Sequence, residues 1–98
     1  MPTFKVYVLY SSVLDRFYKG QTSNFDERLS YHLGGNEYYT SRANDWFLVW
    51  VTTKENRKEA LALERKLKNL NRTKLLLFIN KYSNELTFQG RELVDKIE

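Results

Sequence analysis

Polar and apolar residues alternate at the start of the chain. Over residues 3–10, Phe4, Val6 and Val8 would point to one face of an extended segment, and Tyr7 to the other. An alternation with a period of two is typical of a strand that is buried on one face. This segment is therefore predicted to form the first strand of a sheet.

Two further segments are predicted to be strands. Residues 16–20 are rich in aromatic side chains and follow a short polar turn at residues 11–15, which predicts a hairpin with a loop longer than two residues. The segment from Trp46 to Thr52 is almost continuously apolar. Because such runs are typical of strands that are covered on both faces, this segment is predicted to be the central strand.

A helix is predicted to begin near Asn24. An asparagine that is followed three positions later by a glutamate, here Glu27, forms an N-terminal capping pattern. The apolar stripe of this helix would consist of Phe25, Leu29 and Leu33. Gly34-Gly35 would end the helix, and residues 36–45 are predicted to form a loop.

The same capping pattern recurs at Asn56 and Glu59. The apolar positions that follow have the spacing of an amphipathic helix, and they are Ala60, Leu63, Leu67 and Leu70. A run rich in Leu, Phe and Ile at residues 73–82 predicts another helix. The apolar positions beyond Asn84 predict a short helix that docks weakly.

The predicted order of elements is strand, strand, helix, strand, helix, helix. This order predicts an α/β protein of the α+β kind, with a small three-stranded, mainly antiparallel sheet flanked by helices. A chain of 98 residues fits one domain. We expect this single domain over residues 1–98, with a core over about residues 4–80 and a C-terminal extension over residues 81–98.

The composition narrows the possible classes of protein. The chain has no cysteine, which excludes disulfides, thiolate metal sites and cysteine nucleophiles. It has no secretory leader pattern and no apolar run near the roughly 18 residues of a membrane-spanning helix, so we expect a cytoplasmic protein without membrane contact. Residues 54–74 hold eight Lys/Arg and three Glu. This basic segment could contact phosphates, although a solvated helix face would explain the same charges.

Two pairs of side chains could carry chemistry. Tyr7 and Tyr18 are predicted on facing strands of the hairpin and could share one side of the sheet, with ordinary cross-strand aromatic packing as the alternative. Arg28 and His32 are one helical turn apart and could supply a fixed cation and a proton carrier. An exposed arginine beside an incidental surface histidine would explain the same spacing.

Glu64 interrupts the apolar pattern of its predicted helix, where Ala60, Leu61 and Leu67 are its neighbours. A carboxylate among apolar groups is costly unless it is paired or binds a cation. A single carboxylate, together with waters and a substrate phosphate, is an adequate Mg²⁺ site. The alternative is an ion pair with Lys68, which would stabilise the helix by only about 0.3–0.5 kcal/mol. The residues leave both interpretations open.

The segment from Tyr18 to Thr22 connects the second strand to the cap at Asn24. Gly20 would let the backbone or a substrate approach closely, and Gln21 adds a polar group beside it. The sequence contains no Walker A loop, paired-histidine zinc motif, serine nucleophile elbow or Rossmann fingerprint.

Taken in order, these features resemble the GIY-YIG nuclease family over roughly residues 4–80. Lys5-Val6-Tyr7 resembles the first tripeptide of the family, and Tyr18-Lys19-Gly20 resembles the second. The first tripeptide lacks its glycine, and Lys19 replaces the usual apolar residue.

Further matches to the family lie on the predicted helices. Arg28 resembles the arginine of the family's first helix, with His32 four residues later, and Glu64 resembles the family's metal-binding glutamate. The family also uses a late asparagine near the site, for which Asn80 is the nearest candidate.

The resemblance implies a mechanism of DNA cleavage. Glu64 would hold a single Mg²⁺ or Mn²⁺ ion against the scissile phosphate. Tyr7 would act as general base toward the attacking water, with its pKa lowered by the metal and nearby cations. Tyr18 and His32 would position this water or share the proton, and Arg28 would stabilise charge on the phosphorus. The residues expected to bind substrate are Lys19, Gly20, Gln21, Thr22 and Lys68.

The resemblance thus predicts an endonuclease that hydrolyses DNA phosphodiester bonds, with a preference for particular DNA structures and a link to DNA repair or recombination. A catalytically silent DNA-binding module with the same fold is the first alternative, and a purely structural adaptor is the second. A monomer is the default expectation, with a homodimer as the alternative. The sequence does not indicate which DNA structure is preferred.

Overall fold

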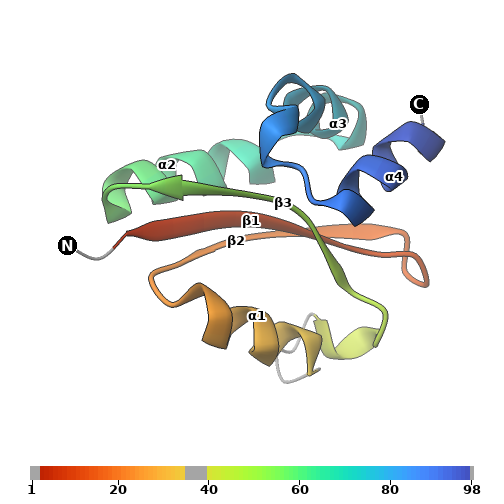
Figure 1. Cartoon of the computed structure of the whole chain (residues 1–98), viewed down its shortest axis with the longest axis horizontal. Helices are drawn as coiled ribbons and strands as arrows, with labels where there is room; N and C mark the ends of the chain where they lie inside the picture. The colour runs from red at the N-terminus through yellow and green to blue at the C-terminus, as the bar shows by residue number, and fades with distance from the viewer. Residues whose placement is uncertain (1–2, 35–39, 98) are drawn as a thin grey trace.

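A computed structural model of the chain describes residues 3–34 and 40–97. Its elements, in chain order, are β1 (Phe4–Ser11), β2 (Arg16–Thr22), α1 (Phe25–Leu33), the 3₁₀ turn η1 (Thr40–Arg42), β3 (Phe47–Lys54), α2 (Arg57–Lys68), α3 (Arg72–Lys81), the 3₁₀ turn η2 (Ser83–Glu85) and α4 (Phe88–Ile97). The predicted α+β class and the predicted order of strands and helices are confirmed. Figure 1 shows a sheet between two layers, with α1 on one face and α2, α3 and α4 on the other.

The three strands are antiparallel and lie in the order β2-β1-β3. The prediction that Trp46–Thr52 forms the central strand is therefore wrong, because β1 is central and β3 lies at an edge. Both faces of β3 are covered: Val49 and Trp50 are buried in the core beneath α2, α3 and α4, and Leu48 and Val51 pack on the side of α1. Residues after η2 also cover part of the outer edge of β3, where the Thr87 amide donates to the Val49 carbonyl at 2.9 Å. An edge strand that is covered in this way carries the same apolar run as a central one.

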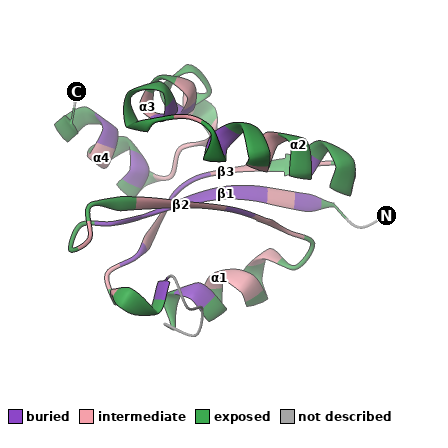
Figure 2. Ribbon diagram, turned by 180° about the vertical axis from the view of Figure 1, so that it is seen from behind, coloured by how far each residue is buried: buried purple, intermediate pink, exposed green. Residues whose placement is uncertain are grey.

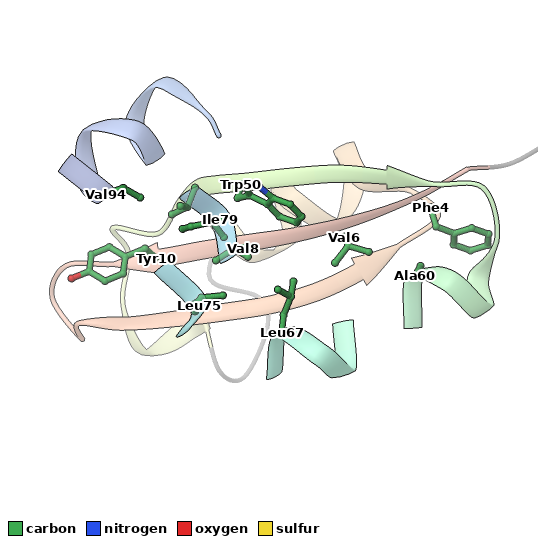
Figure 3. Close-up of a cluster of buried hydrophobic side chains, with 11 residues drawn as sticks. Phe4, Val6, Val8, Tyr10, Trp50, Ala60, Leu67, Leu75, Ile79 and Val94 are labelled. Atoms are coloured by element: carbon green, nitrogen blue, oxygen red, sulfur yellow. The ribbon is translucent and has the colours of Figure 1, made fainter. Parts of the chain in front are cut away.

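The two faces of β1 build two separate cores, as its alternation predicts. Phe4, Val6, Val8 and Tyr10 join the core beneath α2, α3 and α4, which Figure 3 shows. Tyr7 and Leu9 join the smaller core on the side of α1. Strand β1 is largely buried between these layers and β2 and β3 are mostly half-buried, whereas the outward faces of the helices are exposed (Figure 2). Tyr7 therefore lies on the face opposite to the main core.

Helix α1 differs from its predicted pattern at two places. His32 is fully buried, whereas Leu33, which was assigned to the apolar stripe, is 44% exposed. Asn24 is the N-cap residue as predicted, but its side chain makes no capping hydrogen bond to the backbone. Its amide instead donates to the Glu27 carboxylate at 2.7 Å. The helix is thus rotated so that His32 faces the sheet together with Phe25 and Leu29, whereas Leu33 does not.

The end of α1 is only partly described. Gly34 is the C-cap residue, as predicted, while Gly35 lies outside the described residues. The predicted loop over residues 36–45 also lies partly outside them. Its described part begins with η1, whose Thr40 is fully buried.

Helix α2 follows its predicted pattern. The side chain of Asn56 accepts a hydrogen bond from the Glu59 amide at 2.8 Å, which caps the helix. Ala60 and Leu67 are fully buried against the sheet, and Leu63 and Leu70 pack beside them. This packing fixes the rotation of α2, and so determines where Glu64 points.

Helix α4 docks more closely than predicted. Gly90 packs so tightly against the Val49 backbone that a Cβ atom there would overlap it, and Val94 is fully buried. The hydroxyl of Thr87 donates to the Leu48 carbonyl at 2.6 Å and accepts from the Gly90 amide at 2.9 Å. The extension over residues 81–98 is therefore packed firmly against β3, and its boundary with the core stays a prediction. Within the described ranges, no helix has the length and apolar character needed to cross a membrane.

A polar contact joins the β1–β2 hairpin to α3. Asp15 accepts hydrogen bonds from the Arg72 guanidinium at 2.8 and 3.1 Å, and from the Tyr10 hydroxyl at 2.6 Å. The hydrogen bond from Arg72, followed by that from Tyr10, holds the pKa of the Asp15 carboxyl below its usual value of 3.8. The ionised carboxylate is therefore the form that this contact stabilises.

We expect this contact to make stability depend on pH. Since the pKa of Asp15 is lower in the folded state, its contribution is fully present above the unfolded pKa of about 3.8 and is lost as the pH falls through the folded value. Urea unfolding of the wild type and Asp15→Asn should differ at pH 7, and the difference should shrink below about pH 4. Asparagine suits this comparison because it tolerates the positive φ of 53° at this position. A difference that stayed constant down to pH 2 would contradict the prediction.

Candidate active site

The hairpin brings Tyr7 and Tyr18 to the α1 side of the sheet, as predicted. Tyr7 pairs with Gly20 across β1 and β2, and Tyr18 pairs with Leu9, so the two tyrosines are diagonal neighbours. Their ring centroids are 6.5 Å apart, with an interplanar angle of 27°. The alternative of aromatic packing across the strands is thus also present, but packing of the rings alone does not explain why both residues carry a hydroxyl group.

Gly20 makes room for the Tyr7 side chain. A Cβ atom at this position would lie 2.5 Å from the Tyr7 hydroxyl oxygen and 2.7 Å from the ring carbon that bears it. Gly20 is thus a position of close approach, but the group that approaches it is the Tyr7 side chain and not backbone or substrate, and its role in substrate binding stays a prediction.

Replacing Gly20 with alanine should lower activity more than stability. The obstructing atoms belong to the ring end of the buried Tyr7 side chain and not to the backbone, so we expect a stability loss of about 1–3 kcal/mol. The Tyr7 hydroxyl would be displaced, and a displacement of about 1 Å can slow a reaction about 10²-fold. Cleavage rates and melting temperatures of Gly20→Ala, compared with Gly34→Ala at the exposed C-cap of α1, where φ is −79°, would test this. Equal rates in the two variants would contradict it.

His32 lies directly beside the two tyrosines. Its Nε2 atom is 3.0 Å from the Tyr7 hydroxyl, and its ring centroid is 4.7 Å from that of Tyr18. The imidazole is fully buried, so the alternative of an incidental surface histidine is wrong. Because the ring is buried, its position is fixed, and its two nitrogens lie beside the hydroxyls of Tyr7 and Thr40.

Two residues that were not predicted to be site residues support His32. Its Nδ1 atom is 3.3 Å from the hydroxyl of Thr40, which is fully buried. The indole of Trp46 donates to the Thr40 carbonyl at 2.8 Å and so fixes η1 beside α1. Thr40 lies in a polar stretch that was predicted to be a loop, and Trp46 was predicted to be part of a buried strand. The spacing of these residues therefore does not indicate that they contact His32 or η1.

The environment of Tyr7 opposes its ionisation. Burial is the largest cause that raises the pKa of Tyr7 to about 12, and the neighbouring Tyr18 adds to the rise. Arg28 lowers the pKa through a hydrogen bond and its positive charge, but less than burial raises it. The protein alone thus keeps Tyr7 protonated at neutral pH, whereas the family mechanism implies a lowered pKa.

Arg28 is half buried on α1 and is close enough to hydrogen-bond Tyr7. Its guanidinium carbon lies 5.3 Å from the centroid of the Tyr31 ring. Arg28 also lines an open depression of about 420 Å³, together with Thr22, Asn24, Glu27 and Tyr31. The prediction that Arg28 and His32 act from one face of α1 is therefore consistent with the structure, and the depression gives a ligand access to Arg28.

Glu64 lies on α2, within electrostatic range of Tyr7. Its negative charge raises the pKa of Tyr7, so the two groups interact electrostatically. The side chain is 19% exposed and lies 3.6 Å from the Lys68 ammonium, whose own side chain is 56% exposed. The predicted ion pair thus exists, but an exposed pair of this kind stabilises by less than about 1 kcal/mol and leaves the carboxylate able to bind a cation.

The remaining predicted substrate residues lie near α2 or the edge of β2. Lys19 pairs with Val8 and so points to the α2 side of the sheet, where burial and then the charge of Lys68 lower its pKa. Gln21 points to the same side, and its side-chain carbonyl is buried without a hydrogen-bond partner in the described part of the chain. Asn80 lies on α3, across the sheet from α1, and its role stays a prediction.

The donor set around Glu64 suits a hard divalent cation. Within residues 3–34 and 40–97, no group of three or more His, Asp or Glu side chains forms a closed metal site. Mg²⁺ is commonly held by one or two carboxylates, with waters and substrate phosphate completing its octahedron. A single accessible carboxylate beside a basic helix therefore fits Mg²⁺ or Mn²⁺ that is bound together with a phosphate.

Comparison with known proteins places this geometry in a family. A family model described as the GIY-YIG catalytic domain matches residues 4–83. The chain is also similar to the solution NMR structure of a UPF0213 protein from Bacillus halodurans, with 26% sequence identity and a TM-score of 0.54 over 80% of this chain and 83% of that one. No curated protein matches the chain significantly.

Proposed function

The chain belongs to the GIY-YIG catalytic domain family, and from this premise we propose that it is an endonuclease that hydrolyses DNA phosphodiester bonds with one divalent metal ion. The observation that carries the proposal is the hydrogen bond of 3.0 Å between the Tyr7 hydroxyl and His32, which lies beside Arg28 and within the electrostatic reach of Glu64. This arrangement combines a proton path, a fixed cation and a carboxylate.

Glu64 is the residue that would hold Mg²⁺ or Mn²⁺. The bound ion would neutralise charge on the phosphoryl group and on the leaving 3′ oxygen. Lys68 pairs with Glu64 through an exposed ammonium, which can rotate toward a substrate phosphate once the carboxylate binds a cation. Glu64 thus needs no rearrangement of α2 to serve as a metal ligand.

Tyr7 and His32 would move the proton of the attacking water. Since its pKa is about 12, Tyr7 holds its proton, and its hydroxyl would donate to Nε2 of His32 if the histidine proton is on Nδ1. Tyr7 can then accept the proton of the water only as it passes its own proton to His32. This transfer requires the histidine to carry its other proton on Nδ1, where the Thr40 hydroxyl lies 3.3 Å away. Tyr18 packs on the imidazole and keeps it in place.

The substrate phosphate would bind beside Arg28. The depression next to this residue opens to solvent, and a guanidinium there can donate to two phosphate oxygens. Lys19 and Lys68 add positive charge on the α2 side, and the unpartnered carbonyl of Gln21 could accept from a bound water. These residues are proposed to hold the backbone of the strand that is cut.

One observation favours the alternative of a DNA-binding module without turnover. Burial holds the pKa of Tyr7 far above neutrality, and a tyrosine that cannot pass on its proton would not activate water. Such a protein would bind DNA in a salt-dependent way without cutting it. The two functions therefore differ in metal-dependent cleavage and not in DNA affinity.

A cleavage panel separates the two functions. The wild type would be incubated with single-stranded, duplex, nicked, flapped and branched DNA in Mg²⁺, Mn²⁺ or EDTA. Cleavage that requires the metal would support the endonuclease and identify the preferred structure. Salt-sensitive binding of every DNA without any cleavage would support the binding module.

The biological setting is also a proposal. We propose that the enzyme acts in the cytoplasm, as a monomer, on particular DNA structures that arise in repair or recombination. The basis is the family's chemistry together with the basic segment at residues 54–74. Sedimentation of the protein with and without DNA would show whether a second copy is needed.

A further inference from the structure

A second cavity lies at the outer edge of β3, between that strand, α2, α3 and η2. Its volume is about 330 Å³. Three aromatic side chains, Trp50, Phe78 and Tyr82, line it together with Lys54 and Lys66. None of these residues belongs to the group around Tyr7, His32 and Glu64, so the catalytic proposal does not explain the cavity.

The aromatic side chains are packed against each other and carry cations on their faces. The ring centroids of Phe78 and Tyr82 are 4.9 Å apart, and those of Trp50 and Phe78 are 5.7 Å apart. The ammonium of Lys66 lies 5.1 Å from the Phe78 ring, and that of Lys81 lies 5.6 Å from the Tyr82 ring. Tyr82 is 42% exposed, so part of its ring surface is open to a ligand.

The polar groups of the cavity suit a ligand that is flat, polar at its edges and attached to a phosphate. Lys54 and Lys66 supply positive charge, while Asn84 and Glu85 supply a side-chain amide and a carboxylate. The amide can donate and accept, and the carboxylate can accept from an exocyclic amino group. Aromatic side chains with nearby cations are the platforms on which proteins stack unpaired bases.

We infer that this cavity binds one unpaired nucleobase of the DNA substrate, an inference that rests on the proposed function. Leu63 and Lys66 of α2 line the cavity, whereas Glu64 lies between them in the sequence and acts on Tyr7. The two sites are thus separated by roughly the width of one helix, about 10 Å. The exposed side chains of Arg65 and Lys68 lie on that helix.

This position gives the cavity a role in substrate choice. A base inside a duplex is stacked and paired, so only a base in a flap, a tail or a bulge can enter. A strand whose phosphate lies at Glu64 could cross the basic surface of α2 and place a base against Tyr82. The enzyme would then prefer DNA in which the strand becomes unpaired next to the cleavage site.

The test uses the full chain with Glu64→Gln, so that the DNA is bound but not cut. A duplex with a short single-stranded tail that contains 2-aminopurine is compared with a fully paired duplex with the same number of phosphates. The tailed DNA should bind about tenfold more tightly, and its 2-aminopurine fluorescence should be quenched on binding. Adding Tyr82→Ala should remove both effects, whereas Phe88→Ala, at an 80% exposed aromatic outside the cavity, should remove neither.

The outcomes separate this inference from the proposed function. Tailed DNA that binds equally well to the Tyr82→Ala variant, or shows no quenching, overturns the inference even if the wild type cuts DNA. Quenching that depends on Tyr82 in a protein that cuts no DNA supports the inference and argues against the endonuclease. If Tyr82→Ala lowers the melting temperature, Tyr82→Leu keeps apolar bulk against Phe78 without a ring, and it should lose the quenching as well.

Discussion

Replacing Glu64 with alanine should abolish metal-dependent DNA cleavage and leave the fold intact. Its carboxylate is the one proposed to hold the ion, and a metal supplies several kcal/mol of transition-state stabilisation. Because about 1.36 kcal/mol corresponds to one decade in rate, the loss should be at least about 10³-fold. The fold should survive because the side chain is partly exposed and loses only the ion pair of 3.6 Å with Lys68. Cleavage rates in Mg²⁺ and a thermal melt would measure both effects.

The matched control for this variant lies on the same helix. Glu59→Ala removes an exposed carboxylate from the first turn of α2 and should leave cleavage unchanged. Calorimetric titration with Mn²⁺ and a non-cleavable DNA should show an ion that binds to the wild type and to Glu59→Ala but not to Glu64→Ala. Undiminished cleavage by Glu64→Ala would place the metal at other residues and would overturn the assignment.

Much of the fold follows from local patterns in the sequence. The period of two in β1 correctly separates Tyr7 from Phe4, Val6 and Val8, because successive side chains of a strand always point to opposite faces. The stripe of α2 is also correct, since its leucines have no other surface to bury. Glycines and caps then place the ends of most elements to within two residues.

The errors have a common physical origin. An apolar run shows that a strand is covered but not that other strands pair with both of its edges. The edge of β3 is covered instead by a segment far along the chain, whose Thr87 amide donates to the Val49 carbonyl. The rotation of α1 depends on hydrogen bonds to the sheet, so His32 enters the core although Leu33 is the more hydrophobic residue. The strand order and the rotation of α1 are determined by tertiary contacts, which cannot be predicted from the spacing of residues within one element.

The candidate site, like the fold, was predictable only in part. The resemblance to the family implied that Tyr7, Tyr18, Arg28 and His32 act at one site, and the structure brings these side chains together. The direction of the pKa shift at Tyr7 was not predictable, because it depends on how much solvent α1 excludes. Burial raises this pKa by more than Arg28 lowers it. Turnover by the proposed mechanism would therefore depend on positioned charges, and Arg28 is a cation that hydrogen-bonds Tyr7.

Replacing Arg28 with alanine should lower cleavage by about 10²–10³-fold, with a weaker effect on DNA affinity. Removing a preorganised donor that stabilises transition-state charge has a cost of this size. The loss should appear mainly in kcat, because Arg28 hydrogen-bonds Tyr7 and lines the depression where the phosphate is proposed to bind. Arg28→Lys should recover only part of the rate, since an ammonium lacks the planar fork.

Two measurements distinguish a catalytic role of Arg28 from a role in binding a DNA phosphate. Single-turnover cleavage and equilibrium DNA binding should be measured for Arg28→Ala and for Arg91→Ala, which removes an exposed arginine of α4 whose guanidinium bonds the Ser83 carbonyl. Arg91→Ala should match the wild type in both measurements. If Arg28→Ala weakened binding as much as cleavage, Arg28 would be a phosphate anchor. The stabilising charge at the phosphorus would then have to come from Lys19 or Lys68, which lie on the α2 side of the sheet.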